Sequence, residues 1–412
     1  MNTISVGKAM SRNFFLDQGL SEKVTSWTLS LEERASGKSG FRFSETATQT
    51  SIMSTAMAVL VFELFRKLPV PDQELWKAFL LSAQDSETGL FLDPLLTPAD
   101  LKTGSPGEEY IHHQTTYFAL HALDALNSHS SSPLSFTQPY MEKAHMEKWL
   151  ESLDWTKPWF SSNWIMFLAS AIIFQGLVDS SVTHLSWINH LLDWLDAHQD
   201  SQTGFWGSLP GVPAEHAMAA AYHFLPFYLW AGRRFRFAEQ IIDSTLSLQG
   251  EDGLFHSSKG GDSCLDVDAL DILVKCMQLT DHRSEVVEKA VDRIFIGLAD
   301  NQDEAGGFCR ARFRPVPPKS RKRKLAEFFL VDKLLNRPFR PGKETWRYSG
   351  WSLMPYEIHR GDLWSTWFRG YGLGLICKTF PQKYPSTIEW KFRRLPALGW
   401  HNLEDIARVI AA

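Results

Sequence analysis

The chain has 412 residues, of which 44% are hydrophobic and 22% are charged, and its formal net charge is −5. This balance excludes a disordered or collagen-like chain and is typical of a folded globular protein. The 16 Trp and 28 Phe residues would fill a core, and so many aromatic rings also suit a deep apolar cavity.

The N-terminal 18 residues lack the apolar segment of a signal peptide. The most apolar stretch, residues 165–178, is too short to span a bilayer, so we expect a buried helix there. The four cysteines form no CxxC pair, which favours free thiols in a reducing compartment over a zinc or thioredoxin site. We therefore expect a cytoplasmic protein, peripheral to a membrane at most.

A short pattern recurs along the chain: Gln, three or four mostly polar residues, Gly, any residue, and then an aromatic residue. Four copies run from Gln84 to Phe91, Gln199 to Trp206, Gln249 to Phe255 and Gln302 to Phe308. Their Gln residues are separated by 115, 50 and 53 positions, so one copy is lost, near residues 152–159. A degenerate earlier copy lies at residues 37–43. The spacing predicts about six repeats of roughly fifty residues.

Each part of the pattern has a physical reason. An amphipathic helix precedes the copy, as in residues 187–197, where Trp187, Leu191 and Trp194 share one side. The Gly lets the chain turn where a Cβ would clash. The Gln side chain can bond backbone groups left open at the helix end. The aromatic ring then fills the gap between neighbouring repeats.

A second helix follows each copy and is apolar on nearly all faces, for example in residues 165–174 and 217–225. Such a helix is expected to be buried, so these helices form an inner wall and the helices ending in Gln an outer wall. The fold class predicted is all-α, a single (α/α)6 toroid that forms one domain over residues 1–412, with its repeats at about 40–380. The polar starts of the inner helices then converge at one mouth of the ring.

The repeat resembles the QW repeat of squalene and terpene cyclases and of their relatives, the β subunits of protein prenyltransferases. The resemblance covers about residues 40–380 and implies an α6/α6 toroid with an active site inside the ring.

Four acids cluster at the start of one inner helix: Asp262, Asp266, Asp268 and Asp271. Helix capping accounts for Asp262 or Asp266. It accounts poorly for Asp271, which lies more than a turn inside. The functional alternative is a set of catalytic carboxyls, Asp266, Asp268 and Asp271, in which crowding in a low dielectric keeps one acid protonated.

Asp266 and Asp268 resemble the first two acids of the DxDD motif of class II terpene cyclases. The resemblance implies that Asp268 holds the position of the acid that protonates an alkene or epoxide. The chain departs from the motif at Ala269, where the family commonly has Asp or Thr. The Asp and Cys that bind zinc in protein prenyltransferases are not reproduced, so no protein-bound metal is predicted. Mg²⁺ would enter only with a diphosphate substrate.

Other polar and aromatic residues on the inner helices are candidates for contacting a substrate. His113 and His216 lie at predicted helix starts, and Arg369 lies on an inner helix where it needs either an Asp of the 266–271 group or an anionic substrate as partner. Core packing and structural hydrogen bonds are the alternative roles for all of them. The full set of predicted substrate-binding residues is His113, His216, Tyr222, His223, Trp206, Trp364, Trp367 and Arg369.

Residues 310–347 form a basic, proline-rich insertion, with thirteen Lys or Arg against three acids. It interrupts a repeat between its turn and its inner helix, which places it at the cavity mouth. It is either a solvated loop or a binding surface for a diphosphate, an acidic polysaccharide or a phospholipid membrane. We expect no nucleic-acid binding, because no recognition motif accompanies the charge.

Three functions are consistent with such a ring. The first is a class II-type terpenoid cyclase, an isomerase or lyase that acts on an isoprenoid. The second is a carbohydrate-active toroid: a glycoside hydrolase, a polysaccharide lyase or an epimerase. The third is a toroid without catalysis that binds a lipid or a partner protein.

Overall fold

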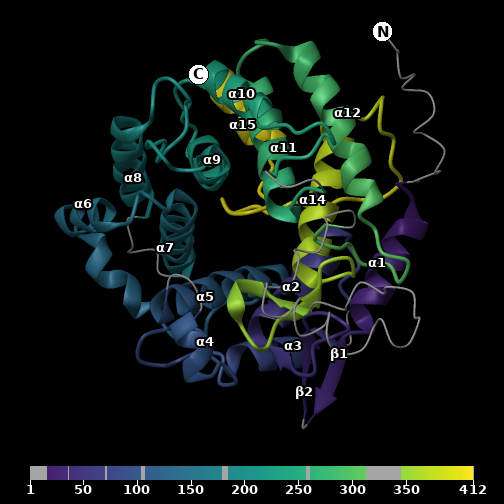
Figure 1. The fold of residues 1–412 in the computed structure, drawn as a ribbon. Coiled ribbons are helices and arrows are strands. Elements are labelled where there is room, and N and C mark those ends of the chain that lie inside the picture. The colour runs from purple at the N-terminus through teal and green to yellow at the C-terminus, as the bar shows by residue number, and fades with distance from the viewer. Residues whose placement is uncertain are drawn as a thin grey trace, which may run out of the picture.

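The computed structural model describes residues 16–35, 37–69, 72–103, 107–178, 184–256, 260–311 and 345–411. Within these ranges six inner helices contact each other in sequence and close into a ring, because the last one also packs against the first (Figure 1). They are Ile52–Leu64 (α2), Glu108–Ala125 (α5), Pro158–Val178 (α7), Ala214–Trp230 (α9), Ser263–Met277 (α11) and Leu363–Thr379 (α14). The prediction of an α/α toroid is confirmed.

An outer layer of helices surrounds this ring. Its members alternate with the inner helices along the chain: Gln18–Leu29 (α1), Gln73–Leu81 (α3), Lys143–Ser152 (α6), His184–His198 (α8), Ala238–Ser247 (α10) and Ser284–Asp300 (α12). Shorter helices cover residues Pro98–Thr103 (α4) and Ser135–Met141 (η3). The outer helices bury one side only, as Trp187, Ile188, Leu191, Leu192, Trp194 and Leu195 do in α8. Every residue of α2, by contrast, is buried, as expected for an inner helix.

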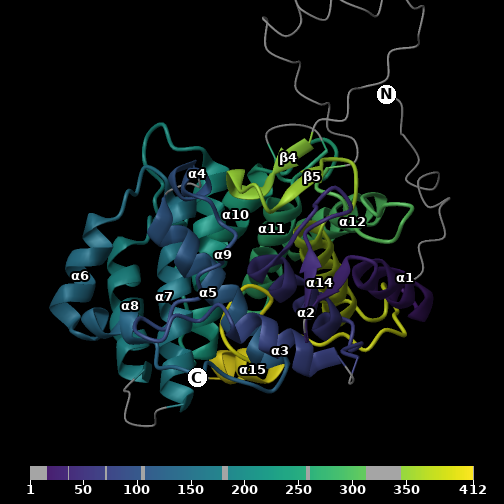
Figure 2. The ribbon, with the colours of Figure 1, turned by 90° about the horizontal axis from the view of Figure 1, so that it is seen from below.

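Two small sheets add to the helical ring. Glu32–Ala35 (β1), Lys38–Arg42 (β2) and Thr50–Ser51 (β3) form an antiparallel sheet in that order. Thr345–Arg347 (β4) pairs antiparallel with Pro355–Glu357 (β5), with Trp346 opposite Tyr356, and a 3-10 turn at Tyr348–Gly350 (η4) follows β4. The β4–β5 pair lies at one end of the ring, and the C-terminal helix Leu403–Ala411 (α15) lies at the other (Figure 2).

The Gln of each repeat holds the turn that follows it. Its Nε2 donates to the carbonyl of the repeat's own Gly in all four copies: Gln84 to Gly89, Gln199 to Gly204, Gln249 to Gly253 and Gln302 to Gly306, at 2.8–3.2 Å. In the first three copies it donates as well to a backbone carbonyl of the next outer segment, at Ser132, Arg236 and Ala290. The Gln therefore bridges its turn to the next repeat, which is more than the helix-end bond expected from sequence.

The aromatic residue of the repeat is fixed to the inner helix. The backbone N–H of Phe91 donates to Thr116 Oγ1 at 2.8 Å, and that of Phe308 donates to Thr366 Oγ1 at 2.9 Å. In the degenerate first copy, Phe41 N–H likewise donates to Thr55 Oγ1 at 2.9 Å. These bonds lock each turn against the ring.

The turn between α6 and α7 lies at the position where the repeat pattern of Gln, Gly and an aromatic residue is missing from the sequence. There the indole of Trp155 donates to Leu150 O at 3.0 Å, as the indole of Trp206 donates to Leu195 O at 2.8 Å in an intact copy. One aromatic thus still fills the joint between repeats although the Gln and Gly are gone.

Helix α7 is longer than the stretch picked out from the sequence. It runs from Pro158 to Val178 and is the one described helix long and apolar enough to cross a bilayer. It nevertheless belongs to the inner wall, with 78% of its most apolar window buried in the ring. Of the basic segment 310–347, residues 312–344 lie outside the described part of the chain, so the prediction of an anion-binding surface stays a prediction.

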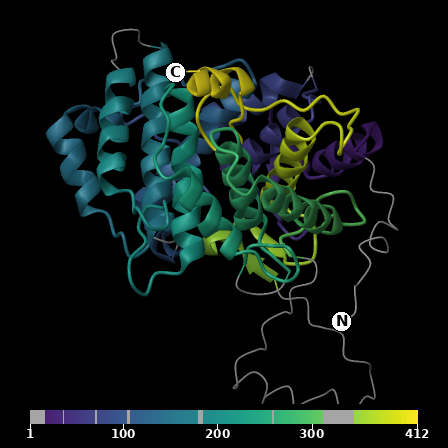
Figure 3. The same ribbon diagram turned by 90° about the horizontal axis from the view of Figure 1, so that it is seen from above.

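The chain after α14 returns to the ring and closes the end opposite β4 and β5 (Figure 3). Ala397, Leu398 and Trp400 are buried there, and α15 follows across this end. The sequence analysis did not predict this closure.

Candidate active site

A cavity of about 230 Å³ lies at the mouth of the ring where the inner helices begin. Its aromatic and polar walls come from five inner helices, the segment after the fourth repeat, the η4 turn and the C-terminal segment. The lining residues are Tyr110, Gln114, Trp159, Phe160, Asn163, His223, Cys264, Asp268, Arg310, Tyr348, Ser349, Trp364, Phe368 and Leu398. The predicted convergence of helix starts at one mouth is what places these side chains together.

Asp268 lies in the second turn of α11 and is the one carboxyl in the cavity lining. It is only 1% exposed, and its Oδ1 has no hydrogen-bond partner within the described part of the chain. Burial, together with the charges of Asp262, Asp271 and Asp266, raises the pKa of Asp268 well above its ordinary value. Asp268 therefore holds its proton to a higher pH than an exposed carboxyl does, and it lies in the cavity wall.

Asp266 is fully buried but does not line the cavity. Its Oδ2 pairs with Arg369 Nη1 at 3.3 Å and accepts the backbone N–H of Asp262 at 3.1 Å, while Oδ1 accepts that of Phe255 at 2.9 Å. The bond from Phe255 is the one that Thr55, Thr116 and Thr366 accept in other repeats. Asp266 thus occupies a structural position of the repeat. It is also the partner of Arg369, as one of the two alternatives from sequence predicted.

Arg369 itself is fully satisfied inside the protein. Besides Asp266, its guanidinium donates to the carbonyl of Cys309 at 3.0 Å and to that of Arg310 at 2.6 Å. The ion pair therefore holds the chain after the fourth repeat against α14, and it does not reach the cavity.

Asp271 lies deeper, below the cavity. It forms a buried ion pair with Lys275 and accepts a hydrogen bond of 2.5 Å from the hydroxyl of Tyr371. Lys275 also donates to the carbonyl of Trp400 at 3.2 Å, so this network ties the C-terminal segment to the ring. Desolvation raises the pKa of Asp271, and the nearby Lys275 ammonium opposes that shift.

Asp262 caps α11 by accepting the N–H of Cys264 at 3.1 Å, as the capping interpretation predicted. Its Oδ2 accepts from Arg310 Nε at 2.8 Å. Arg310 lines the cavity, so this pair places a guanidinium at the cavity wall with its charge balanced by the cap.

His223, on α9, is the polar group contributed by that helix to the cavity. The Ser162 hydroxyl donates to the carbonyl of Trp159 at 3.0 Å and lies 2.8 Å from His223 Nδ1. Ser162 and His223 are thus linked by a hydrogen bond, which fixes the orientation of the imidazole in the cavity wall. Burial lowers the pKa of His223 to about 3, so the ring is neutral.

Aromatic faces supply most of the remaining wall. The Trp364 indole donates to Cys264 Sγ at 2.7 Å, and its ring lies 4.6 Å from that of Tyr348 and 4.8 Å from that of Phe368, measured between centroids. Tyr348 is held in turn by Gln114, whose Nε2 donates to its hydroxyl at 2.8 Å. Electron-rich faces fixed in this way stabilise positive charge.

Several predicted substrate-binding residues lie outside the cavity lining. His113 accepts from the Trp164 indole at 3.2 Å, and its burial lowers its pKa to about 4. His216 is half-buried and packs against Trp159, with 5.4 Å between ring centroids. Trp206 fills a joint between outer and inner helices, and Trp367 stacks on Tyr371. Tyr222 holds the C-terminal segment by accepting the N–H of Gly399 at 3.3 Å.

The prediction from sequence also missed cavity residues. Tyr110 and Cys264 stand at inner-helix starts, so the convergence argument could have found them. Tyr348 and Leu398 come from segments without the repeat pattern, and no sequence signal marks them.

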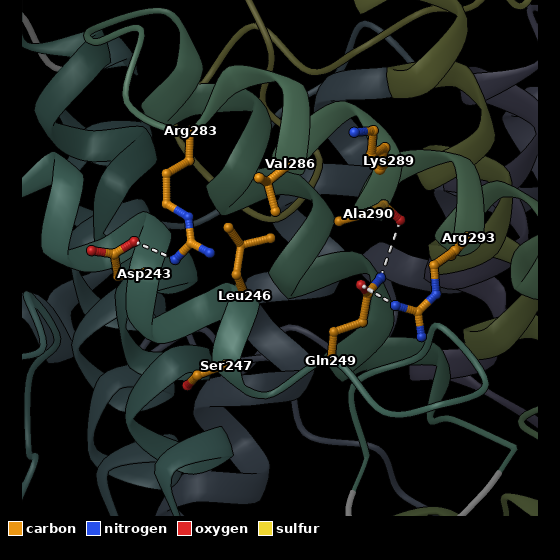
Figure 4. A pocket seen from close by; sticks show the side chains of 9 residues that line it. All are labelled: Asp243, Leu246, Ser247, Gln249, Arg283, Val286, Lys289, Ala290 and Arg293. Atoms are coloured by element: carbon orange, nitrogen blue, oxygen red, sulfur yellow. Dashed lines mark hydrogen bonds and ion pairs between the residues drawn. The ribbon is translucent and has the colours of Figure 1, made fainter. Parts of the chain in front are cut away.

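A larger hollow of about 400 Å³ lies on the outside of the ring, between α10 and α12 (Figure 4). Both of its arginines bond within the lining: Arg283 Nη1 contacts Asp243 at 2.8 Å, and Arg293 Nη1 donates to Gln249 Oε1 at 3.2 Å. Gln249 is the repeat residue that joins these two helices. The hollow is thus the outer side of a repeat joint, and the interior cavity is the better candidate for chemistry.

The donor set of the described residues does not suit a metal. No group of three or more His, Cys, Asp or Glu side chains comes together anywhere in the described ranges. In the cavity, Asp268 is the one carboxyl of the lining, which also holds the cationic Arg310. We therefore derive no step through a metal ion.

Comparison with protein families agrees with this architecture. The model of the prenyltransferase alpha-alpha toroid domain family matches residues 4–105 and 95–314. Among solved structures, the type II terpene cyclase MstE from Scytonema, in complex with its product merosterolic acid A, is similar with a TM-score of 0.46 and 15% identity, over 88% of this chain and 97% of that one. The comparison with curated proteins gives no match. Since the family model spans most of the sequence, the chain belongs to the prenyltransferase alpha-alpha toroid domain family.

Proposed function

We propose that this protein is a terpenoid cyclase of the class II type, in which Asp268 protonates an isoprenoid inside the ring. The observation that carries the proposal is Asp268: a buried carboxyl in a cavity with aromatic walls, whose Oδ1 has no hydrogen-bond partner within the described residues and whose pKa is raised. Family membership supports the same reaction class but does not specify it.

The chemistry uses groups already in the cavity. The O–H of Asp268 gives its proton to one carbon of an alkene, and the π electrons form the new C–H bond, leaving a tertiary carbocation and an aspartate. Further double bonds of the chain attack that cation and close rings, while the faces of Trp364, Phe368 and Tyr348 stabilise the moving charge.

The last cation then loses a proton to a base. His223 is suited to this step because its ring is neutral and lines the cavity. Return of that proton to Asp268 through water regenerates the enzyme. Substrate and product have the same formula, so the overall reaction is an isomerisation.

The carbohydrate-active alternative is supported less well. Glycoside hydrolysis by the common mechanism needs two carboxyls on opposite sides of the scissile bond. Of the three acids predicted to be catalytic, only Asp268 lines the cavity, because Asp266 pairs with Arg369 and Asp271 with Lys275.

The proposal is tested by incubating the purified protein with a panel of prenyl diphosphates and prenyl alcohols, with and without Mg²⁺, and analysing products by mass spectrometry. We expect a cyclic isomer of one panel member, formed without Mg²⁺ and abolished by Asp268→Asn. Asn keeps the shape of the side chain but has no acidic proton.

Asp271→Asn is the matched control on the same helix, because it also removes a buried acid but lies outside the cavity. Equal loss of activity in both variants would refute the assignment to Asp268. No conversion of any member by a folded wild-type protein would refute the cyclase proposal, and saturable binding without turnover would then favour a binding toroid.

A further inference from the structure

We propose that Leu398 is the floor of the cavity and sets how much of a substrate chain can enter the ring. The inference rests on the proposed function for its biological meaning, since it names the specificity-determining residue of that site. The inference goes beyond the proposed function by assigning a role to the C-terminal segment, residues 393–401.

The C-terminal segment is fastened inside the ring by helices on several sides. The N–H of Leu398 donates to Tyr117 Oη of α5 at 2.8 Å, and the N–H of Gly399 donates to Tyr222 Oη of α9 at 3.3 Å. The carbonyl of Trp400 accepts from Lys275 of α11 at 3.2 Å and from Tyr371 of α14 at 3.3 Å. So many buried bonds fix the height of the segment within the ring.

Gly399 shows how closely the backbone approaches the wall. Its φ is +80°, and a Cβ at this position would lie 2.6 Å from Trp367 Cζ2. The chain therefore reaches this depth only with Gly here, which orients the preceding Leu398 side chain as part of the cavity lining.

The position of Leu398 makes the cavity short. Ligand cavities usually exceed 300 Å³, so a cavity of about 230 Å³ is small for a whole prenyl chain. The substrate class inferred is thus a prenyl chain of which only the end beside Asp268 is enclosed. The remainder leaves past the partly exposed Trp159, Phe160 and Ser349.

The floor is tested with saturated straight-chain alcohols of six to sixteen carbons, which contain no alkene and therefore bind without reacting. Each methylene that enters the cavity raises affinity about fourfold, whereas methylenes left in water at the mouth add little. Affinity measured by thermal shift should rise with chain length and reach a plateau in the wild type once the enclosed end of the chain extends to Leu398.

Leu398→Ala removes three carbons from the floor and should move that plateau about three carbons longer. Leu398→Phe should shorten it. Leu398→Val makes a milder change and keeps the test usable if the Ala variant does not fold. Leu395→Ala is the matched control, since Leu395 is a buried leucine of the same segment that does not line the cavity.

An unchanged plateau in folded Leu398 variants, or an equal shift in Leu395→Ala, would overturn the inference. Because the probes cannot be protonated, the result is independent of the cyclase proposal. A shifted plateau without any turnover would support the role of Leu398 and refute the cyclase proposal. Turnover with an unchanged plateau would support the cyclase proposal and refute the role of Leu398.

Discussion

Replacing Asp268 with Asn should make the protein more stable, and the gain should grow as the pH rises. In the wild type, the folded state holds the proton on Asp268 to a higher pH than the unfolded chain does, because burial and the neighbouring acids raise the pKa of this carboxyl well above its usual value. The unfolded chain loses that proton near pH 4. Between this pH and the folded pKa the folded state binds more protons than the unfolded state, so wild-type stability falls as the pH increases through that range.

The size of the effect follows from the linkage relation. Between about pH 4 and the folded pKa, the wild type should lose about 1.4 kcal/mol relative to Asp268→Asn for each pH unit. A chain of 412 residues has an unfolding entropy of about 0.9 kcal/mol/K, so the gap in Tm should widen by about 1.5 °C per pH unit. The two proteins share all other buried acids, so their difference isolates Asp268.

Differential scanning calorimetry at pH 5, 6 and 7 measures this gap. Asp281→Asn, at an exposed carboxyl, serves as control and should melt in parallel with the wild type. Parallel melting of Asp268→Asn and the wild type across the range would refute the reasoning, because it would mean that Asp268 ionises in the folded protein as it does in the unfolded chain.

Three further predictions concern the ring itself. Arg369→Leu should lower the free energy of unfolding in urea by about 3–5 kcal/mol, because it leaves Asp266 buried without its cation. Adding Asp266→Thr should recover most of this loss, since Thr holds the same position in other repeats. An unchanged free energy of unfolding in Arg369→Leu would contradict the structural role of the pair. Gly204→Ala should lower the free energy of unfolding by more than the roughly 1–2 kcal/mol expected for Gly211→Ala. Both glycines have positive φ, but a Cβ at Gly204 would lie 2.5 Å from Ile241 Cγ1, whereas nothing lies within 4 Å of one at Gly211; equal costs would show that the turn is not tightly packed. Gln199→Ala should lower the unfolding free energy by about 1–3 kcal/mol by removing two backbone contacts, and the exposed Gln202→Ala should leave it unchanged.

The ring could be predicted from the sequence because its structure repeats along the chain. Gln, Gly and an aromatic residue at a fixed spacing each serve a joint between repeats, so one readable pattern defines most of the inner and outer helices. Helices apolar on every face could be assigned to the inner wall by burial alone. Local additions were not predictable in this way: the β4–β5 pair and the closing C-terminal segment belong to no repeat.

The candidate site could be predicted from the sequence only in part, because the partners of its side chains depend on three-dimensional packing. Position along α11 indicated that the acids gather at the mouth, but sequence spacing does not give the partners of each. Asp266 and Asp271 meet Arg369 and Lys275, and only three-dimensional packing shows that Asp268 remains without such a partner. His223 and Trp364 were among the residues predicted to contact substrate and do line the cavity, whereas Leu398 reaches it from the far end of the chain.

The proton donated by Asp268 is the central claim, and heavy water tests it most directly. With a substrate found in the panel, the reaction is run in D₂O and the product mass is compared with that formed in H₂O. The account predicts a cyclic product one mass unit heavier, because the acid delivers one deuteron and a proton of the substrate leaves at the end. A cyclic product of unchanged mass would show that no proton from Asp268 starts the reaction, and would contradict the account.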